Sequence, residues 1–246
     1  MDMRHLTGHV EYHEGWDLQR STHEAVRAEE QADTVFLLEH ASVYTAGART
    51  NRAEYPTDGT EVIKVDRGGK ITWHGPGQIV AYPIIKLAKP FDVVEYVRTL
   101  EQAVMDVCAA FGLETIRVEG RSGVWVAADS PDVETPRLER KVCAIGARVA
   151  KGVTMHGLAL NCDADLTAFD HIVPCGIPAE DADVTSLTAE LGRRVTVDDV
   201  RPLLEAALIE RLAPLLARQE TPSAVPSPMP AAVPVPVPAA AAVATA

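Results

Sequence analysis

The chain has 246 residues, of which 47% are hydrophobic and 24% are charged, and its formal net charge is −12. This length and composition fit a globular protein with a substantial core. Lys and Arg form no cluster that could neutralise a phosphate backbone, so we expect no nucleic-acid partner. The first residues lack an apolar signal segment, and no stretch resembles a membrane span. We therefore expect a cytoplasmic protein without a membrane contact.

Helices and strands are predicted to interleave along the chain. The hydrophobic pattern predicts a polar helix at 15–31, strands at 34–40 and 61–65, a turn or strand at 41–47, a buried strand at 78–85, a helix at 93–111, a strand at 123–129, two strands within 141–161, and a last helix at 198–217. The clearest is the helix at 93–111, because Asp92 is a good N-cap and the apolar residues, Cys108 included, recur at helical spacing. The mixture, without a strict strand–helix–strand repeat, predicts an α+β (mixed α/β) single domain.

The C-terminal residues differ in composition from the rest. Residues 221–246 contain seven prolines and no charged residue. Such a sequence favours extended polyproline II conformations and provides nothing for a core. We therefore expect a folded domain at 1–220 and a disordered Pro/Ala-rich tail at 221–246.

A glycine-rich segment is the first candidate site. It reads Arg67-Gly68-Gly69-Lys70-Ile71-Thr72-Trp73-His74-Gly75-Pro76-Gly77-Gln78. Glycines let a ligand approach the backbone closely, and alternation in a short strand would put Thr72 and His74 on one face and Trp73 on the other. A tight hairpin with a capped turn is the alternative. The spacing of a phosphate-binding loop is absent.

Three further segments carry candidate groups. In a regular strand Lys141, Cys143 and Ile145 would share one face, although a surface lysine at the start of a strand is the commoner case. His156 precedes Gly157, and its spacing alone favours a hydrogen-bonded core histidine over a site residue. Cys175 lies between Pro174 and Gly176 on a predicted loop, where a thiol can be exposed and reactive, or incidental to a turn.

Cysteine usage does not point to disulfides or to a metal. The four cysteines, Cys108, Cys143, Cys162 and Cys175, are too few for a disulfide scaffold in a chain of this size. Cys162, His171 and Cys175 could approach a metal, but their spacing matches no zinc pattern. We therefore expect free thiols and no metal.

Taken together, the segments 67–78, 141–149, 155–161 and 174–176 resemble those of the octanoyl-[acyl-carrier-protein]:protein octanoyltransferases of lipoate biosynthesis, and the resemblance covers about residues 5–215. It implies a mixed sheet flanked by helices, as in biotin and lipoate protein ligases. It also implies a catalytic dyad in which Cys175 is the nucleophile and Lys141 its partner. The substrate-binding residues it implies are Arg67, Gly68, Gly69, Lys70, Ile71, Thr72, Trp73, His74, Ala144, Ile145, Gly146, Gly157, Leu158 and Ala159.

The resemblance implies octanoyl transfer from octanoyl-acyl carrier protein, through a thioester on Cys175, to a lysine of lipoyl domains. The expected acceptors are the lipoyl domains of 2-oxoacid dehydrogenase E2 subunits and the glycine cleavage H protein. Because a thioester is already activated, we expect no cofactor, no ATP and no metal beyond the phosphopantetheine of the donor. A monomer is expected. Two alternatives stay open, an ATP-dependent lipoate or biotin ligase on the same fold and a scaffold that binds acyl carrier protein without turnover.

Overall fold

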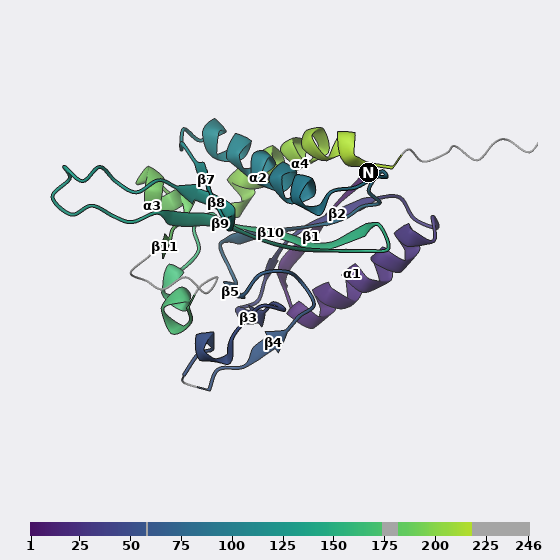
Figure 1. The fold of residues 1–246 in the computed structure, drawn as a ribbon, viewed down its shortest axis with the longest axis horizontal. Coiled ribbons are helices and arrows are strands. Elements are labelled where there is room, and N and C mark those ends of the chain that lie inside the picture. Colours follow the sequence, from purple (N-terminus) through teal and green to yellow (C-terminus); the bar gives the residue numbers. More distant parts are fainter. Residues whose placement is uncertain (58, 174–181, 218–246) are drawn as a thin grey trace, which may run out of the picture.

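The fold is built on a mixed sheet of eight strands. The computed structural model describes residues 1–57, 59–173 and 182–217. Seven strands follow the spatial order β1-β2-β6-β10-β9-β8-β7, and β11 pairs with β9 (Figure 1). The β1–β2 and β9–β11 pairs are parallel and the others antiparallel. These strands are β1 Asp2–Val10, β2 Thr34–His40, β6 Gln78–Ile84, β7 Ile116–Val118, β8 Arg121–Val126, β9 Arg140–Ala150, β10 Val153–Asn161 and β11 Asp183–Val184.

Helices cover both faces of this sheet (Figure 1). Helices α2 and α4 pack on one face, where Leu100 and Leu204 join the main core, and α1 packs on the other, where Val26 is buried. In β2, Leu37 belongs to the first core and Phe36 to the second, which is why the strand is an unbroken apolar run in the sequence. The helices are α1 Tyr12–Arg27, α2 Val93–Ala110, α3 Leu187–Leu191 and α4 Val197–Leu212, with short 3₁₀ helices at Arg52–Glu54, Leu166–His171 and Ala213–Leu215.

A small sheet lies beside the main one, on the side that α1 covers (Figure 1). Its order is β4-β3-β5, with β3 at Val43–Ala46, β4 at Val62–Lys64 and β5 at Ile71–His74. Trp73 packs edge-on against Phe169 in a separate small core. The small sheet therefore holds the glycine-rich segment against β9 and β10.

Most of the predicted elements are confirmed, with shifts at their ends. The two strands predicted within 141–161 are β9 and β10, joined at Lys151 and Gly152, which both have positive φ. Asp92 caps α2 by accepting a hydrogen bond from the Val94 backbone N–H, at 2.7 Å. The helix predicted at 198–217 ends as an α-helix at Leu212.

Two differences have physical causes. The helix predicted at 15–31 begins at Tyr12, because Tyr12 is buried, and ends at Arg27, shortly before Glu29 with its φ of 63°. Strand β1 is not among the predicted elements, because it lies at the sheet edge and its mostly exposed residues show no two-residue alternation.

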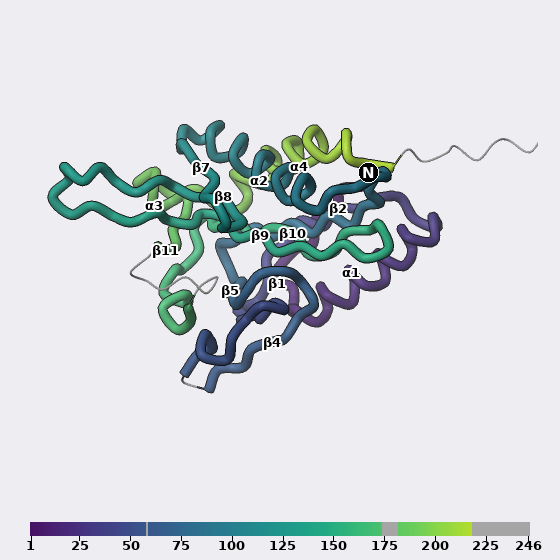
Figure 2. The backbone as a smooth tube through the Cα atoms, viewed as in Figure 1, coloured from purple at the N-terminus to yellow at the C-terminus, as the bar shows by residue number. Residues whose placement is uncertain are grey.

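The β8–β9 connection is long and projects from the body (Figure 2). None of the helices in the described residues has the length and apolarity needed to span a membrane.

Candidate active site

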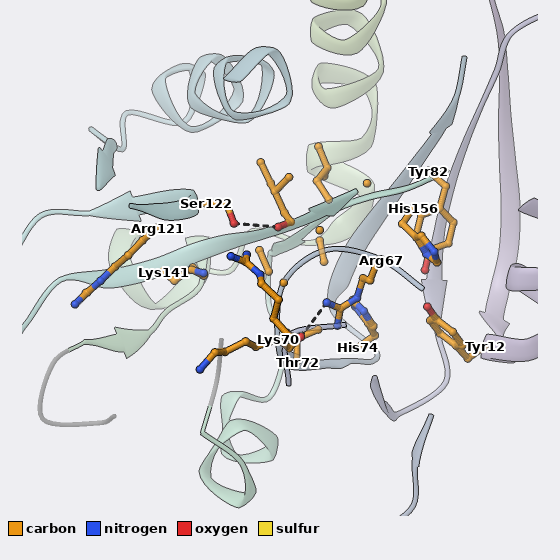
Figure 3. Close-up of a pocket in the computed structure, with 18 of the residues that line it drawn as sticks. Tyr12, Arg67, Lys70, Thr72, His74, Tyr82, Arg121, Ser122, Lys141 and His156 are labelled. Atoms are coloured by element: carbon orange, nitrogen blue, oxygen red, sulfur yellow. Dashed lines mark hydrogen bonds between the residues drawn. The ribbon is translucent and has the colours of Figure 1, made fainter. Parts of the chain in front are cut away.

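A cavity of about 230 Å³ lies between the β9–β10 hairpin and the glycine-rich segment (Figure 3). Its middle is lined by small and apolar residues of paired positions on β9 and β10, such as Ala144 with Ala159 and Ile145 with Leu158. Cations from Arg121, Lys141 and Lys70 lie on one side of it in Figure 3, and aromatic rings lie on the other. The cavity therefore has a cationic end, an apolar middle and an aromatic end.

Lys141 lies at the cationic end, close to the start of β9. Its side chain is only 6% exposed, and Nζ lies 4.5 Å from the centre of the Trp125 ring. Its backbone carbonyl accepts a 3.0 Å hydrogen bond from the N–H of Thr185. Next to it, the buried Arg140 donates from Nε to Glu190 at 2.8 Å. Both neighbours fix the backbone at residue 141, so the lysine is held in place and is not a mobile surface residue.

Cys143 does not share the face of Lys141, contrary to the prediction from regular alternation. The β8–β9 register shifts between the pairs Val124–Cys143 and Trp125–Lys141, which is the signature of a β-bulge. Cys143 is fully buried in the main core, whereas Lys141 lines the cavity. A local irregularity thus reverses the expected relationship between the two side chains.

Arg67 fastens the glycine-rich segment to β3. Its Nη2 donates to both the carbonyl and the hydroxyl oxygen of Thr45, each at 2.9 Å. Its Nη1 donates to the carbonyls of Gly68 and Lys70, at 3.0 and 2.9 Å. A Cβ on Gly146 would lie only 3.0 Å from the Gly68 carbonyl oxygen, so the missing side chain there admits this segment. The guanidinium therefore shapes the cavity wall.

Histidines and tyrosines make the aromatic end. His74 is buried, and its Nδ1 forms a 2.7 Å hydrogen bond with Gln78. Burial lowers the pKa of His74 to about 3 and that of His40 to about 4, so both rings are neutral at pH 7. Burial also raises the pKa of Tyr12 to about 12 and that of Tyr82 well above its ordinary value. The imidazole and phenol groups of this end are therefore uncharged at pH 7, although the buried Arg67 guanidinium lies close enough to act electrostatically on His74, Tyr12 and Tyr82.

His156 belongs to this aromatic end and has a specific partner. Its ring is 1% exposed, and Nε2 lies 2.9 Å from Oδ1 of Asp66. Burial lowers the pKa of His156, although the Asp66 carboxylate opposes that effect. The hydrogen bond from His156 in turn holds the pKa of Asp66 below its usual range. The prediction of a hydrogen-bonded buried histidine is therefore confirmed at Nε2, whereas the buried Nδ1 has no hydrogen-bond partner among the described residues. The residue also lines the cavity.

The described thiols are buried and unreactive in character. Cys108, Cys143 and Cys162 are all free and fully buried. Burial raises the pKa of Cys108 to about 12, and it raises the pKa values of Cys143 and Cys162 strongly as well. A thiol reacts as its thiolate, so none of these three is suited to be a nucleophile. Cys175 lies outside the described residues.

The structure brings most of the predicted site residues together. Those that line the cavity are Arg67, Gly69, Lys70, Thr72, His74, Lys141, Ala144, Ile145, Gly146, Gly157, Leu158 and Ala159. Ile71 and Trp73 instead face the small core with Phe169, on the opposite side of β5. Gly68 is not among the residues that line the cavity, and its N–H donates to the Ala147 carbonyl at 3.1 Å.

Several cavity residues are not among the predicted ones. Tyr12 and Tyr82 line the aromatic end, Arg121 and Ser122 lie on the same side as Lys141, and Arg49 also lines the cavity. Tyr82 could have been noticed in the sequence, because its hydroxyl lies in a mostly apolar strand and a buried hydroxyl needs a hydrogen-bond partner. Nothing local distinguishes Tyr12 or Arg49, because both reach the cavity through tertiary packing.

Within the described residues, no group of three or more His, Cys, Asp or Glu side chains is arranged to hold a metal ion.

Comparisons with known proteins place the chain in one family of enzymes. Residues 11–209 match the family model described as the lipoyl protein ligase A/B catalytic domain. The chain is 59% identical over 207 residues to an octanoyltransferase of Salinispora tropica, covering 84% of this chain and 94% of that protein. It is 56% identical over 231 residues to an octanoyltransferase of Mycobacterium tuberculosis, covering 93% and 95%.

Solved structures show the same fold at much lower identity. A chain of the bi-partite lipoate protein ligase from Thermoplasma acidophilum matches with a TM-score of 0.61 and 19% identity, covering 87% of this chain and 84% of that one. Lipoate-protein ligase A bound with ATP matches with a TM-score of 0.56 and 17% identity, covering 87% and 86%. The predicted mixed α/β single domain is therefore confirmed.

Proposed function

Because the chain belongs to the lipoyl protein ligase A/B catalytic domain family and is an acyltransferase of the octanoyltransferase kind, we propose that it carries the octanoyl group as a thioester on Cys175. In this proposal the donor is octanoyl-acyl carrier protein. The acceptor is a lysine of a lipoyl domain, in 2-oxoacid dehydrogenase E2 subunits or the glycine cleavage H protein.

The observation that carries the proposal is the position of Lys141 relative to the chain on either side of residue 175. On the C-terminal side, Val184 pairs with Lys141 in the β11–β9 ladder. On the N-terminal side, the N–H of Val173 donates to the Glu54 carbonyl at 3.3 Å, and the Glu54 carboxylate pairs with Nζ of Lys70 at 2.5 Å. Both flanks therefore lie beside residues of the cationic end of the cavity.

The other cysteines support the same assignment. Each of the three described thiols is buried in the core with a raised pKa, and none lines the cavity. A nucleophile that must reach a bulky thioester needs an accessible, ionised sulfur. Cys175 is the remaining cysteine of the chain.

The first half-reaction forms the acyl-enzyme. The Lys141 ammonium stabilises the Cys175 thiolate, which attacks the carbonyl carbon of the octanoyl thioester. The tetrahedral oxyanion then collapses, the bond to the phosphopantetheine sulfur breaks, and that sulfur leaves as a thiolate that takes up a proton. Backbone N–H groups of the glycine-rich segments are the available oxyanion donors, and one such donor is typically worth about 2.7–4 kcal/mol.

The second half-reaction forms the amide. The neutral amine of the acceptor lysine attacks the thioester carbonyl, the Cys175 thiolate leaves, and the nitrogen loses one proton. That proton goes to the departing thiolate, or to Lys141 if Lys141 has become a neutral amine by giving its own proton to the phosphopantetheine thiolate in the first half-reaction. The thioester provides the driving force, so the proposal needs no ATP, no metal and no resident cofactor. The small and apolar middle of the cavity, with Ala144, Ala159 and Leu158, offers an acyl chain a dry surface.

The test is intact-mass analysis of the full chain after incubation with octanoyl-acyl carrier protein. We expect an increase of one octanoyl group in the wild type and in Cys143→Ser, and none in Cys175→Ser. The Cys143→Ser variant is the matched control, since that sulfur is nearer to Lys141 in sequence but is buried in the core. An acyl adduct on Cys175→Ser would refute the nucleophile assignment.

The ATP-dependent ligase needs its own test, because lipoate ligases share this fold. A ligase would form an acyl-adenylate from free octanoate and would exchange pyrophosphate into ATP. We expect no exchange with octanoate or lipoate, and lipoyl-domain modification that proceeds without ATP. Exchange that survives Cys175→Ser would favour the ligase.

A further inference from the structure

The cavity has a definite length between its cationic and aromatic ends. Its middle follows the β9–β10 ladder from the Ala144–Ala159 pair to the Ala147–His156 pair, three steps along the strands. Three steps correspond to about 10 Å. An extended chain gains about 1.2 Å per single bond, so the seven carbon–carbon bonds of an octanoyl group span roughly 8 Å. An octanoyl chain that starts at the Ala144–Ala159 pair therefore fills most of this length and ends about 2 Å short of the aromatic end, which leaves room for only one or two further carbons.

The aromatic end is a wall made from three separate elements. Tyr12 comes from the first turn of α1, Tyr82 from β6 and His156 from β10, and all three are less than 5% exposed. Figure 3 shows these three side chains together on the side of the cavity opposite Lys141. The Tyr82 and His156 rings pack edge to face with centroids 6.5 Å apart. This wall closes the apolar channel.

Hydrogen bonds hold the wall from behind. Nδ1 of His40 lies 2.8 Å from the Val10 carbonyl, which can only accept, so Nδ1 carries the proton. Nε2 of His40 is then an acceptor, and it receives the Tyr82 hydroxyl at 2.7 Å. The hydroxyls of Tyr12 and Tyr82 also interact. The polar groups of both tyrosines are thus engaged with each other and with His40.

Packing holds Tyr12 in the same way. Its ring centroid lies 5.0 Å from that of His40 and 6.2 Å from that of His74, with the latter pair stacked. A longer chain could advance only by displacing this ring and breaking buried hydrogen bonds, which is unfavourable. A shorter chain leaves apolar surface unfilled, and each missing methylene weakens binding by about fourfold.

We infer that Tyr12, together with Tyr82 and His156, sets the upper limit of acyl-chain length by closing the far end of the cavity. This inference rests on the proposed function, in that it places the acyl chain of the donor in this cavity. Tyr12 is the principal residue, because it is supplied by a helix and not by the sheet and can be shortened without altering a strand.

The test compares acyl loading of the full chain with hexanoyl, octanoyl, decanoyl and dodecanoyl thioesters of acyl carrier protein, followed by intact mass. In Tyr12→Ala we expect the ratio of the dodecanoyl to the octanoyl loading rate to rise by at least about tenfold over wild type. Tyr55→Ala is the matched control, since it removes the same side chain from a site that does not line this cavity. Its ratio should equal that of the wild type.

The outcomes separate this inference from the proposed function. If octanoyl loads on the wild type but Tyr12→Ala keeps the wild-type dependence of loading rate on acyl-chain length, the role of Tyr12 in limiting chain length is refuted. The proposed transfer mechanism is then unaffected. If no thioester loads on the wild type, the proposed function fails first. Should Tyr12→Ala not fold by circular dichroism, Tyr12→Leu, which keeps an apolar contact for α1, decides in its place. A wild-type protein that loads dodecanoyl as fast as octanoyl would overturn the inference without any variant.

Discussion

Nε2 of His156 lies 2.9 Å from Oδ1 of Asp66, and this contact joins β10 to the residue that immediately precedes the Arg67 loop. His156 has a φ of 58°, which is unusual for a residue other than glycine. Its backbone N–H donates to Oε1 of Gln19 at 2.8 Å, so α1 also holds it. The strained histidine therefore links three parts of the wall around the cavity: the sheet, the loop and the helix.

Burial of neutral histidines predicts acid sensitivity. The folded-state pKa values of His40 and His74 are about 4 and about 3, below the unfolded value near 6.5, and that of His156 is also lowered. Below pH 6.5 the unfolded chain therefore binds protons that the folded chain does not. The free energy of unfolding therefore decreases as the pH is lowered. We expect a loss of about 2 kcal/mol at pH 5 for each of His40 and His74.

Urea denaturation between pH 7.5 and 5 measures this effect. The slope of the free energy of unfolding against pH gives the protons taken up on unfolding, and we expect two to three in the wild type near pH 5. His74→Gln should lower that number by about one. His9→Gln, on an exposed position of β1, should leave it unchanged. A slope that is the same in His74→Gln would contradict the assignment.

Replacing Lys141 by Met should slow acyl-enzyme formation by about a hundredfold at pH 7. Methionine retains the bulk over the Trp125 ring but removes the charge next to the proposed thiolate. The pH at which Cys175 becomes reactive toward iodoacetamide should shift upward, as followed by the rate of alkylation. Lys64→Met, an exposed lysine on β4, is the control and should behave as wild type. An unchanged alkylation profile together with lost turnover would show that the ammonium acts elsewhere in the reaction.

Arg67→Lys should destabilise the fold by about 3 kcal/mol, because an ammonium cannot reproduce a planar fork that donates to four oxygens on three residues. Thr45→Val removes a single acceptor of that fork and should cost about 1 kcal/mol. Both values come from urea denaturation at pH 7.5. If the lysine variant were as stable as the wild type, the guanidinium would not be the anchor of the glycine-rich segment.

The sequence was sufficient to predict the helices and strands whose apolar residues recur with a strong periodicity. The α2 stripe and the β9–β10 hairpin were readable because their apolar spacing and turn residues agree with the final packing. The small core that takes up Trp73 also follows from alternation in β5. Strand β1 was not readable, since an exposed edge strand is specified by its partner and not by its own pattern.

The residues of the site could be predicted from the sequence only where they belong to a sequence motif. The glycine-rich segment and the neighbours of Lys141 and Gly157 lie around one cavity. The bulge beside Cys143 could not be foreseen, because it depends on how β8 meets β9. Tyr12 reaches the cavity from a helix far away in the sequence, so only the tertiary structure reveals it.

Gly157 is the clearest case in which a glycine has a role other than leaving room for the acyl chain. A Cβ at residue 157 would lie 2.2 Å from the Ala81 carbonyl oxygen and 2.8 Å from Cδ of Pro83, so it would collide with β6 and not enter the cavity. We expect Gly157→Ala to cost about 3 kcal/mol or more, since β6 and β10 are both central strands. Gly112→Ala, after α2, has a φ of 88° but open space around it and should cost only about 1–2 kcal/mol.

Measured together by urea denaturation, the two glycine variants separate a backbone collision from backbone strain. Gly157→Ala should be the less stable of the two, although Gly112 and not Gly157 has positive φ. Acyl loading of whatever fraction of Gly157→Ala is folded should keep the wild-type preference for chain length, because the added methyl group points away from the cavity. A stable Gly157→Ala protein that accepts only shorter acyl chains would show the reverse, that the added methyl group enters the cavity and does not meet the β6 backbone.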